Sequence, residues 1–138
     1  MPLTTHIDMT QTMLQRIITL AQQDTPLMGM VSGIYDYVPQ GTLLPYVRCS
    51  YGRSATEPAR TASIARMELH ADIWTDYHGM AHAWNIAKRL ETVWSLTNLR
   101  ATAGMYVVSW QMRDHKVEMK ADAPIRCTRL RFDAVTSL

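Results

Sequence analysis

The stretch from Met67 to Trp74 alternates strictly between two kinds of side chain, and it constrains the fold more than any other feature. One set is apolar and comprises Met67, Leu69, Ala71 and Ile73. The other set comprises Glu68, His70, Asp72 and Trp74. Because successive side chains of a β-strand point to opposite faces, a period of two predicts a strand with one face in a hydrophobic core.

Residues 10–23 carry the three- and four-residue spacing of an amphipathic helix. The apolar positions of this segment are Met13, Leu14, Ile17, Ile18 and Ala21. Asp8, three residues before Gln11, fits a capping box at the start of this helix. Asp24 and Thr25 precede Pro26 and supply a stop, because the residue before a proline avoids the helical conformation.

Residues 78–97 predict a second helix, which Asp76 can cap. Its apolar positions are Met80, Ala83, Trp84, Ile86, Ala87, Leu90, Val93 and Trp94. A helix that is apolar over so much of its circumference is expected to cover a sheet.

Several shorter segments have extended character. We expect strands over residues 33–38, 45–51, 105–110, 117–119 and 125–134, with a turn at 39–41. Residues 52–62 are rich in Gly, Ser, Thr and Pro without periodicity and predict a mobile loop. In the last strand the apolar parity changes near Thr128, which predicts a β-bulge there.

This order of elements predicts the fold class. Helix, extended pieces, helix and further strands indicate a two-layer α+β domain, with a mainly antiparallel sheet and the N-terminal and second helices packed on it. At 138 residues the chain has the length of one domain, so we expect a single domain over residues 1–138.

Composition and charge describe an ordinary globular chain. A formal net charge of +2 is far from the concentrated basic surplus that would itself suggest nucleic-acid binding, so net charge does not indicate the partners. The sequence has no apolar run long enough for a membrane span and no secretory signal, so we expect a cytosolic protein without membrane contact. Cys49 and Cys127 are accordingly expected to be reduced, half-buried thiols.

No catalytic constellation is evident. His78 and His82 have the four-residue spacing of zinc hydrolases, but the segment lacks the adjacent Glu and a third ligand. We therefore interpret them as surface or interface histidines and expect no catalytic, cofactor or metal site. A metal-dependent enzyme built on the two histidines remains an alternative, which zinc analysis would test.

Two groups of residues are candidates for interaction. The first is the basic group Arg126, Arg129 and Arg131, of which Arg129 and Arg131 share a strand face and could meet DNA phosphates or an acidic neighbouring subunit. A solvated edge strand protected by its charges explains this group equally well. The second group is aromatic and comprises Trp74, Tyr35, Tyr37 and Tyr46. Trp74 is either an interface anchor or a side chain covered by a helix.

Five segments in order resemble the tail-completion family of long-tailed phages, prophages and gene transfer agents. They are residues 33–41 (GIYDYVPQG), 44–47 (LPYV), 68–74 (ELHADIW), 78–94 (HGMAHAWNIAKRLETVW) and 125–132 (IRCTRLRF). The resemblance covers nearly the whole chain. The loop at residues 52–62 and the richness in Met and Trp are not diagnostic of the family, so details of interfaces do not follow from the resemblance.

The resemblance implies a non-enzymatic structural subunit. Tail terminators of this kind form a hexameric ring that caps the finished tail tube and joins it to the head connector. The partners would be further copies of the chain, the tube protein, the connector and DNA passing through the lumen. The chain would be assembled in the host cytoplasm and reside at the head-proximal end of the virion tail. Arg129 and Arg131 are candidates for the lumen.

Two alternatives remain at this point. A small nucleic-acid-binding module would use the basic C-terminal strand and nearby aromatic residues. A head–tail connector or another minor tail component would share the structural class of the tail terminators but occupy a different position in the virion.

Overall fold

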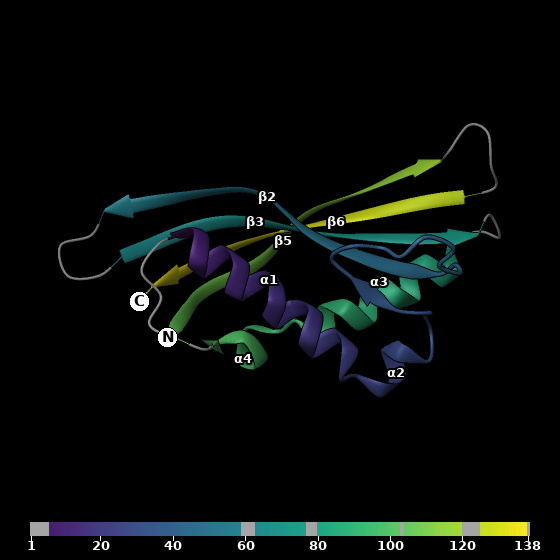
Figure 1. Ribbon diagram of the computed structural model, residues 1–138, viewed down its shortest axis with the longest axis horizontal. Helices are drawn as coiled ribbons and strands as arrows, with labels where there is room; N and C mark the ends of the chain where they lie inside the picture. Colours follow the sequence, from purple (N-terminus) through teal and green to yellow (C-terminus); the bar gives the residue numbers. More distant parts are fainter. Residues whose placement is uncertain (1–5, 59–62, 77–79, 103, 120–124, 138) are drawn as a thin grey trace.

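In the part of the chain that the structure describes, six strands form one sheet, and four helices lie on a single face of it (Figure 1). The computed structural model describes residues 6–58, 63–76, 80–102, 104–119 and 125–137. The strands are β1 (Ile34–Tyr35), β2 (Tyr46–Pro58), β3 (Ser63–Asp76), β4 (Ala101–Thr102), β5 (Met105–Met119) and β6 (Ile125–Ser137). The helices are α1 (His6–Gln22), α2 (Thr25–Met28), α3 (Ala81–Val93) and α4 (Leu96–Leu99).

The sheet is antiparallel except at one edge. Its strand order is β1-β2-β3-β6-β5-β4, and only β1 pairs in parallel, with β2. The four long strands therefore alternate in direction across the sheet. This arrangement confirms the predicted two-layer α+β class.

The alternation in β3 decides which face is covered. Ala65, Met67, Leu69, Ala71 and Ile73 are all buried on the helix side. Helix α1 contributes Met9, Met13, Ile17 and Ala21 to the same core. Both periodicities therefore predict the buried positions correctly, because each places its apolar side chains on one face.

Trp94 joins the two layers. Its indole Nε1–H donates to the backbone oxygen of Ile17 at 2.9 Å, so this buried polar group is satisfied by α1. Its ring packs edge-on against Phe132 of β6, with centroids 5.4 Å apart, and against Trp110 of β5 at 6.2 Å. One side chain thus contacts the first helix and two strands of the sheet.

The helix boundaries differ from the prediction. Asp8 lies inside α1 rather than at its start. Asp24 does not simply end α1; its carboxylate caps α2 by accepting from the backbone N–H of Leu27 at 3.0 Å. The predicted helix over 78–97 is divided in two, because α3 ends at Val93 and the Ser95 side chain caps α4; residues 78 and 79 lie outside the description.

The strands also correct the prediction at several points. Residues 52–58, expected in a mobile loop, lie in β2 and pair with β3, while 59–62 lie outside the described residues. The segments 105–110 and 117–119 belong to one continuous strand, β5. The bulge predicted at Thr128 is wrong, since β6 pairs with β3 without interruption. Irregularities fall instead in β5, between Val107 and Ser109 and between Met112 and Asp114.

The turn predicted at residues 39–41 is present. The backbone N–H of Thr42 donates to the oxygen of Pro39 at 3.2 Å. Gly41 adopts a φ of 84°, a conformation that glycine tolerates without steric cost.

Neither cysteine forms a disulfide, and the two are buried on opposite faces of the sheet. Cys49 pairs with Ala71 on the helix side, whereas Cys127 pairs with Trp74 on the other side. Among the described residues, no helix combines the length and apolar character needed to span a bilayer.

Candidate interaction face of the sheet

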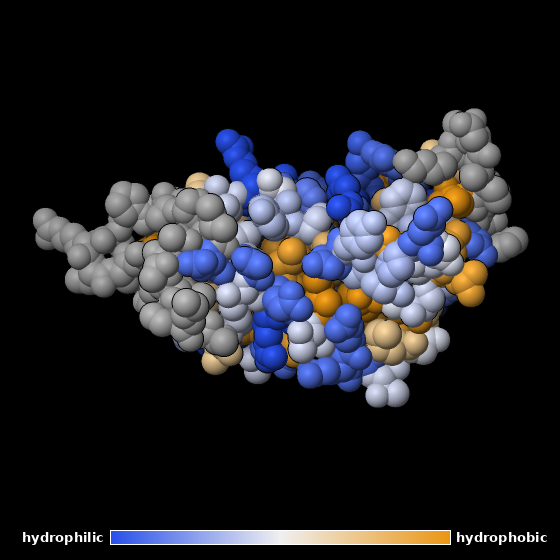
Figure 2. All heavy atoms as spheres, in the orientation of Figure 1, coloured by the Kyte–Doolittle hydropathy of each residue, from blue (hydrophilic) through white to orange (hydrophobic). Residues whose placement is uncertain are grey.

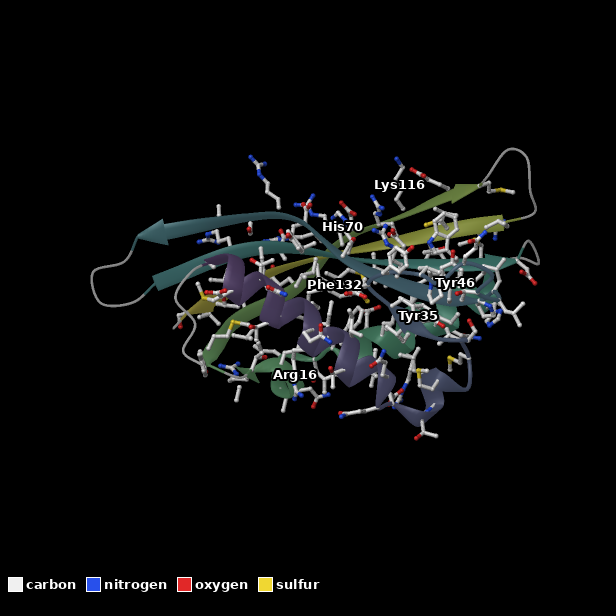
Figure 3. The ribbon with its side chains drawn as sticks, viewed as in Figure 1. Arg16, Tyr35, Tyr46, His70, Lys116 and Phe132 are labelled. Atoms are coloured by element: carbon white, nitrogen blue, oxygen red, sulfur yellow. The ribbon has the colours of Figure 1, made fainter. Side chains whose placement is uncertain are left out.

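The face of the sheet away from the helices is polar. We call it the open face and define it on the two central strands by Glu68, His70, Asp72, Trp74, Cys127, Arg129, Arg131 and Asp133. Figure 3 shows His70 and Lys116 on this side, with Phe132 between sheet and helices. In the same orientation, Figure 2 shows hydrophilic side chains along the upper margin.

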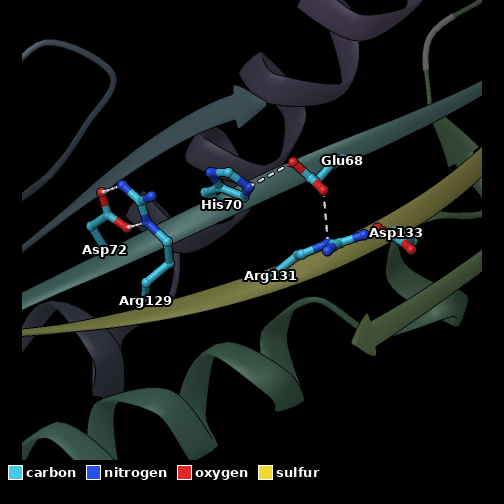
Figure 4. Close-up of polar contacts among 6 residues, drawn as sticks. All are labelled: Glu68, His70, Asp72, Arg129, Arg131 and Asp133. Atoms are coloured by element: carbon cyan, nitrogen blue, oxygen red, sulfur yellow. Dashed lines mark hydrogen bonds and ion pairs between the residues drawn. The ribbon is translucent and has the colours of Figure 1, made fainter. Parts of the chain in front are cut away.

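Asp72 and Arg129 form an ion pair whose carboxylate is the most buried one in the ion pairs of the open face. Arg129 Nε and Nη2 donate to the two carboxylate oxygens of Asp72 at 2.6 and 2.9 Å (Figure 4). The Asp72 side chain is 3% exposed and that of Arg129 is 50% exposed. These hydrogen bonds raise the pKa of Arg129 above its ordinary value, so its guanidinium remains charged at any physiological pH.

Glu68 links the neighbouring charges into a network (Figure 4). Its Oε1 atom lies 2.8 Å from Arg131 Nε, and its Oε2 atom lies 3.0 Å from His70 Nε2. Arg131 also contacts Asp133 at 3.4 Å, and Asp133 accepts from Arg113 Nε of β5 at 2.9 Å. Three carboxylates of the two central strands, Glu68, Asp72 and Asp133, therefore contact Arg113, Arg129 and Arg131.

Gly52 makes room for this network. An added Cβ at Gly52 would clash with the Glu68 carboxylate and approach the His70 ring to 2.8 Å. Pairing between β2 and β3 is irregular between Tyr51 and Ser54, so a bulge carries Gly52 over these two side chains. The glycine thus permits a close approach of backbone to the charged side chains.

At one end of the open face the charge balance becomes positive. A shallow hollow of about 350 Å³ is lined by four arginines, Arg53, Arg66, Arg113 and Arg131, together with Glu68 and Asp133. Four cations against two anions leave a local excess of two positive charges.

The structure separates the three predicted cations. Arg129 and Arg131 lie on the open face, each paired with a carboxylate. Arg126 is buried on the opposite face, and its guanidinium contacts the sulfur of Met80 at 2.7 Å and that of Met119 at 3.9 Å. The three side chains therefore do not form one basic surface.

Three of the four predicted aromatic residues meet at the other end of the open face. Tyr46 stacks on Trp74 with centroids 6.3 Å apart, and Tyr35 packs edge-on against Tyr46 at 6.4 Å. Burial raises the pKa of Tyr46 above its ordinary value. Tyr37 lies apart from this cluster and is almost fully exposed.

The structure places only one member of the histidine pair. His82 is exposed on α3, and His78 lies outside the described residues. Within the described ranges, no group of three His, Cys, Asp or Glu side chains is positioned to hold a metal ion.

Sequence reasoning missed the acidic partners of the arginines. Asp72 and Arg129 are 57 positions apart, so no local pattern connects them. A signal was nevertheless present, since alternation places Glu68, His70 and Asp72 on one face. What the sequence did not provide is the register that sets Asp72 opposite Arg129.

Comparison with known proteins indicates a family and a similar solved structure. The sequence profile described as "Tail completion protein gp17" matches residues 15–137. The fold is similar to a chain from the solved "Virion of native gene transfer agent (GTA) particle", with a TM-score of 0.78 and 22% identity over 88% of this chain and 92% of that chain. No curated protein matches the sequence significantly.

The family match includes nearly all of the sheet and helices described above, and it agrees with the resemblance that the sequence motifs indicated. The chain therefore belongs to the tail completion protein gp17 family and is a structural protein of the phage-type virion tail.

Proposed function

We propose that this chain is a tail terminator, which assembles as a hexameric ring on the tail tube and joins the tube to the head connector. Membership of the tail completion family and the likeness to a chain of a gene transfer agent virion support this proposal. The subunit would act by presenting side chains to further copies and to other virion proteins, without catalysing a reaction.

One observation supports our proposal for how the subunit is oriented in the ring: the charges of Arg129 and Arg131 on the open face are balanced by carboxylates. Arg129 and Arg131 each contact a carboxylate, Asp72 or Glu68, on the adjacent strand. Phosphates passing such a surface meet cations whose charge is already largely neutralised, so they are held weakly. A lumen must let DNA pass, and we therefore place the open face toward the lumen.

The aromatic cluster of Tyr35, Tyr46 and Trp74 is proposed as a contact with the tube or the connector. Large rings with a polar group are favoured in protein interfaces. The cluster lies at one end of the open face, and the basic hollow lies toward the other. The two ends of a terminator ring likewise meet two different partners.

Electron microscopy of particles lacking this protein tests the proposed function. Loss of a terminator is expected to give overlong tails, or heads and tails that do not join. Particles with normal tails joined to heads would contradict the proposal. A defect confined to another part of the tail would instead support a minor tail component.

The lumen placement has its own test. Glu68→Gln with Asp133→Asn removes two negative charges from the open face and is expected to slow DNA delivery while tails still assemble. Glu91→Gln, on the exposed side of α3, is the control and should have no effect. Unchanged delivery in the double variant would refute the lumen placement and leave the terminator role intact.

The basic hollow favours a second candidate, a nucleic-acid-binding module. Four arginines around one hollow could hold phosphates. Binding of the isolated monomer to short duplex DNA, with affinity falling steeply as salt rises, would support this alternative. Arg53→Ala with Arg113→Ala should then weaken binding, whereas negligible binding by the monomer would favour the terminator.

A further inference from the structure

Exposed large apolar side chains are confined to the two lateral edges of the sheet. Among the described residues these side chains are Tyr37, Leu43, Tyr51, Tyr106, Val108, Val117 and Met119. The first three belong to β2 or to the segment between β1 and β2, and the other four belong to β5. None lies on the central strands or the helices, so the apolar surface that a partner could bury is at the edges.

Two pairs of these exposed side chains, Tyr37 with Leu43 and Val117 with Met119, lie at the same position along the strand direction. Tyr46, Trp74, Cys127 and Glu118 form one row across four strands. Tyr37 and Leu43 are in residues 36–45, which connect β1 to β2 beside one end of this row. Val117 and Met119 flank Glu118 at the other end. Tyr37 is 81% exposed, Leu43 76%, Met119 53% and Val117 36%.

Val117 and Met119 on β5 belong to a larger surface whose side chains contact one another or a common neighbour. We call it the methionine patch and define it as Met80, Trp84, Val117 and Met119. Beneath the patch, the buried Arg126 guanidinium contacts the sulfur atoms of both Met80 and Met119. Trp84 is fixed by an edge-on contact with His115 of β5, with ring centroids 5.3 Å apart. Figure 2 shows hydrophobic surface at the end of the molecule where β5 ends.

The opposite edge differs in shape and charge. Residues 36–45 form a turn-containing segment that exposes a tyrosine and a leucine, and its one charged residue is Asp36. The methionine patch has the cation of Arg126 at its base. An acidic segment with apolar side chains therefore complements a methionine surface over a cation, and methionine side chains adapt readily to a partner.

We propose that Tyr37 and Leu43 of one copy pack on the methionine patch of the next copy. The proposal rests on the proposed ring. A ring requires a head-to-tail contact between two different surfaces of the same chain. Because the two groups lie at opposite ends of one row, rotation about an axis along the strands brings the Tyr37 edge of one copy to the Met119 edge of its neighbour.

Native mass spectrometry of purified full-length chains, alone and with the tail tube protein, tests this contact. The wild type is expected to form a ring in at least one condition. Tyr37→Ser with Leu43→Ser, and separately Val117→Ser with Met119→Ser, should each abolish it. Val108→Ser, an exposed valine of β5 away from the row, is the matched control and should retain the ring.

Mixing the two double variants gives a sharper test. Each retains one intact surface, so a one-to-one mixture should give dimers that contain one copy of each variant and do not grow further. Circular dichroism and thermal unfolding should match the wild type, since the changed side chains are exposed. Rings that persist in both double variants would refute this contact and leave the terminator role intact.

Cross-linking covers the case in which a double variant folds poorly. Leu43→Cys mixed with Met119→Cys should form an intersubunit disulfide on oxidation, whereas either variant alone should not. Cys49 and Cys127 are buried and do not compete. A ring without this cross-link would overturn the contact. A wild type that forms no oligomer, even with tube protein, would overturn the proposed function itself.

Discussion

Asp72 and Arg129 face each other across β3 and β6, joined by two hydrogen bonds of 2.6 and 2.9 Å. The carboxylate is almost completely buried, whereas the guanidinium is half exposed. Hydrogen bonds from Arg129 thus satisfy a charge that would otherwise be buried without a partner.

Asp72→Ala is expected to lower the free energy of unfolding by about 1–2 kcal/mol, because the interaction is charged but half exposed to solvent. Urea denaturation of Asp72→Ala, of Arg129→Ala and of the double variant would give the coupling energy between the two side chains. Lys116→Ala is the control, since Lys116 and Glu118 are both exposed and their pair should contribute no more than about 0.5 kcal/mol. If Asp72→Ala lowered the free energy of unfolding as little as Lys116→Ala does, the Asp72–Arg129 pair would not be important for stability.

Asp24 is expected to make stability depend on pH in the acid range. Hydrogen bonds from Arg89, at 2.7 Å, and a weaker effect of the Leu27 backbone N–H hold the pKa of Asp24 below its ordinary value of 3.8, against the opposing effect of burial. A lowered carboxyl pKa contributes stability above the unfolded-state value, and this contribution is lost as pH falls through the folded-state value.

The comparison with Asp24→Asn measures this effect. The wild type should have the higher unfolding midpoint at pH 6, and the difference should shrink progressively below about pH 4. A difference that stays constant from pH 6 to pH 2 would show that the charge of Asp24 is not responsible.

Trp94 is expected to be the most sensitive core position. Trp94→Ala removes a fully buried ring and its hydrogen bond to Ile17 and should cost about 3–5 kcal/mol in urea denaturation. Trp74→Ala serves as the comparison, because Trp74 is only half-buried on the open face, and should cost no more than about 2 kcal/mol. Equal losses would mean that the open-face aromatic cluster is as important to folding as the core.

The thiols are expected to be unreactive in the folded protein. Burial raises the pKa of Cys49 far above its ordinary value, and the thiolate is the reactive form of cysteine. A chromogenic disulfide reagent should therefore label neither cysteine of the native protein on the timescale on which it labels both in denaturant. A Cys49→Ser variant assigns the signal, and rapid labelling of native Cys49 would contradict its placement in the core.

The sequence alone determined the features that depend on local geometry. Strict alternation from Met67 to Trp74 was enough to identify which side chains of β3 are buried, because side-chain direction in a strand follows from the backbone. The same reasoning placed Arg129 and Arg131 on one face, and helical spacing identified the buried side of α1. The family resemblance likewise needed only the order of the motifs.

Only the tertiary structure decided the features that depend on distant partners. Residues 52–58 have the composition of a loop, yet they form a strand because β3 supplies hydrogen bonds along their length. No bulge interrupts β6 at Thr128, and Cys127 therefore faces away from the helices. Register is set by pairing between strands far apart in sequence, so it alone brought Arg129 opposite Asp72. Arg126 lies on the other face because β6 alternates without interruption from Arg126 to Arg129.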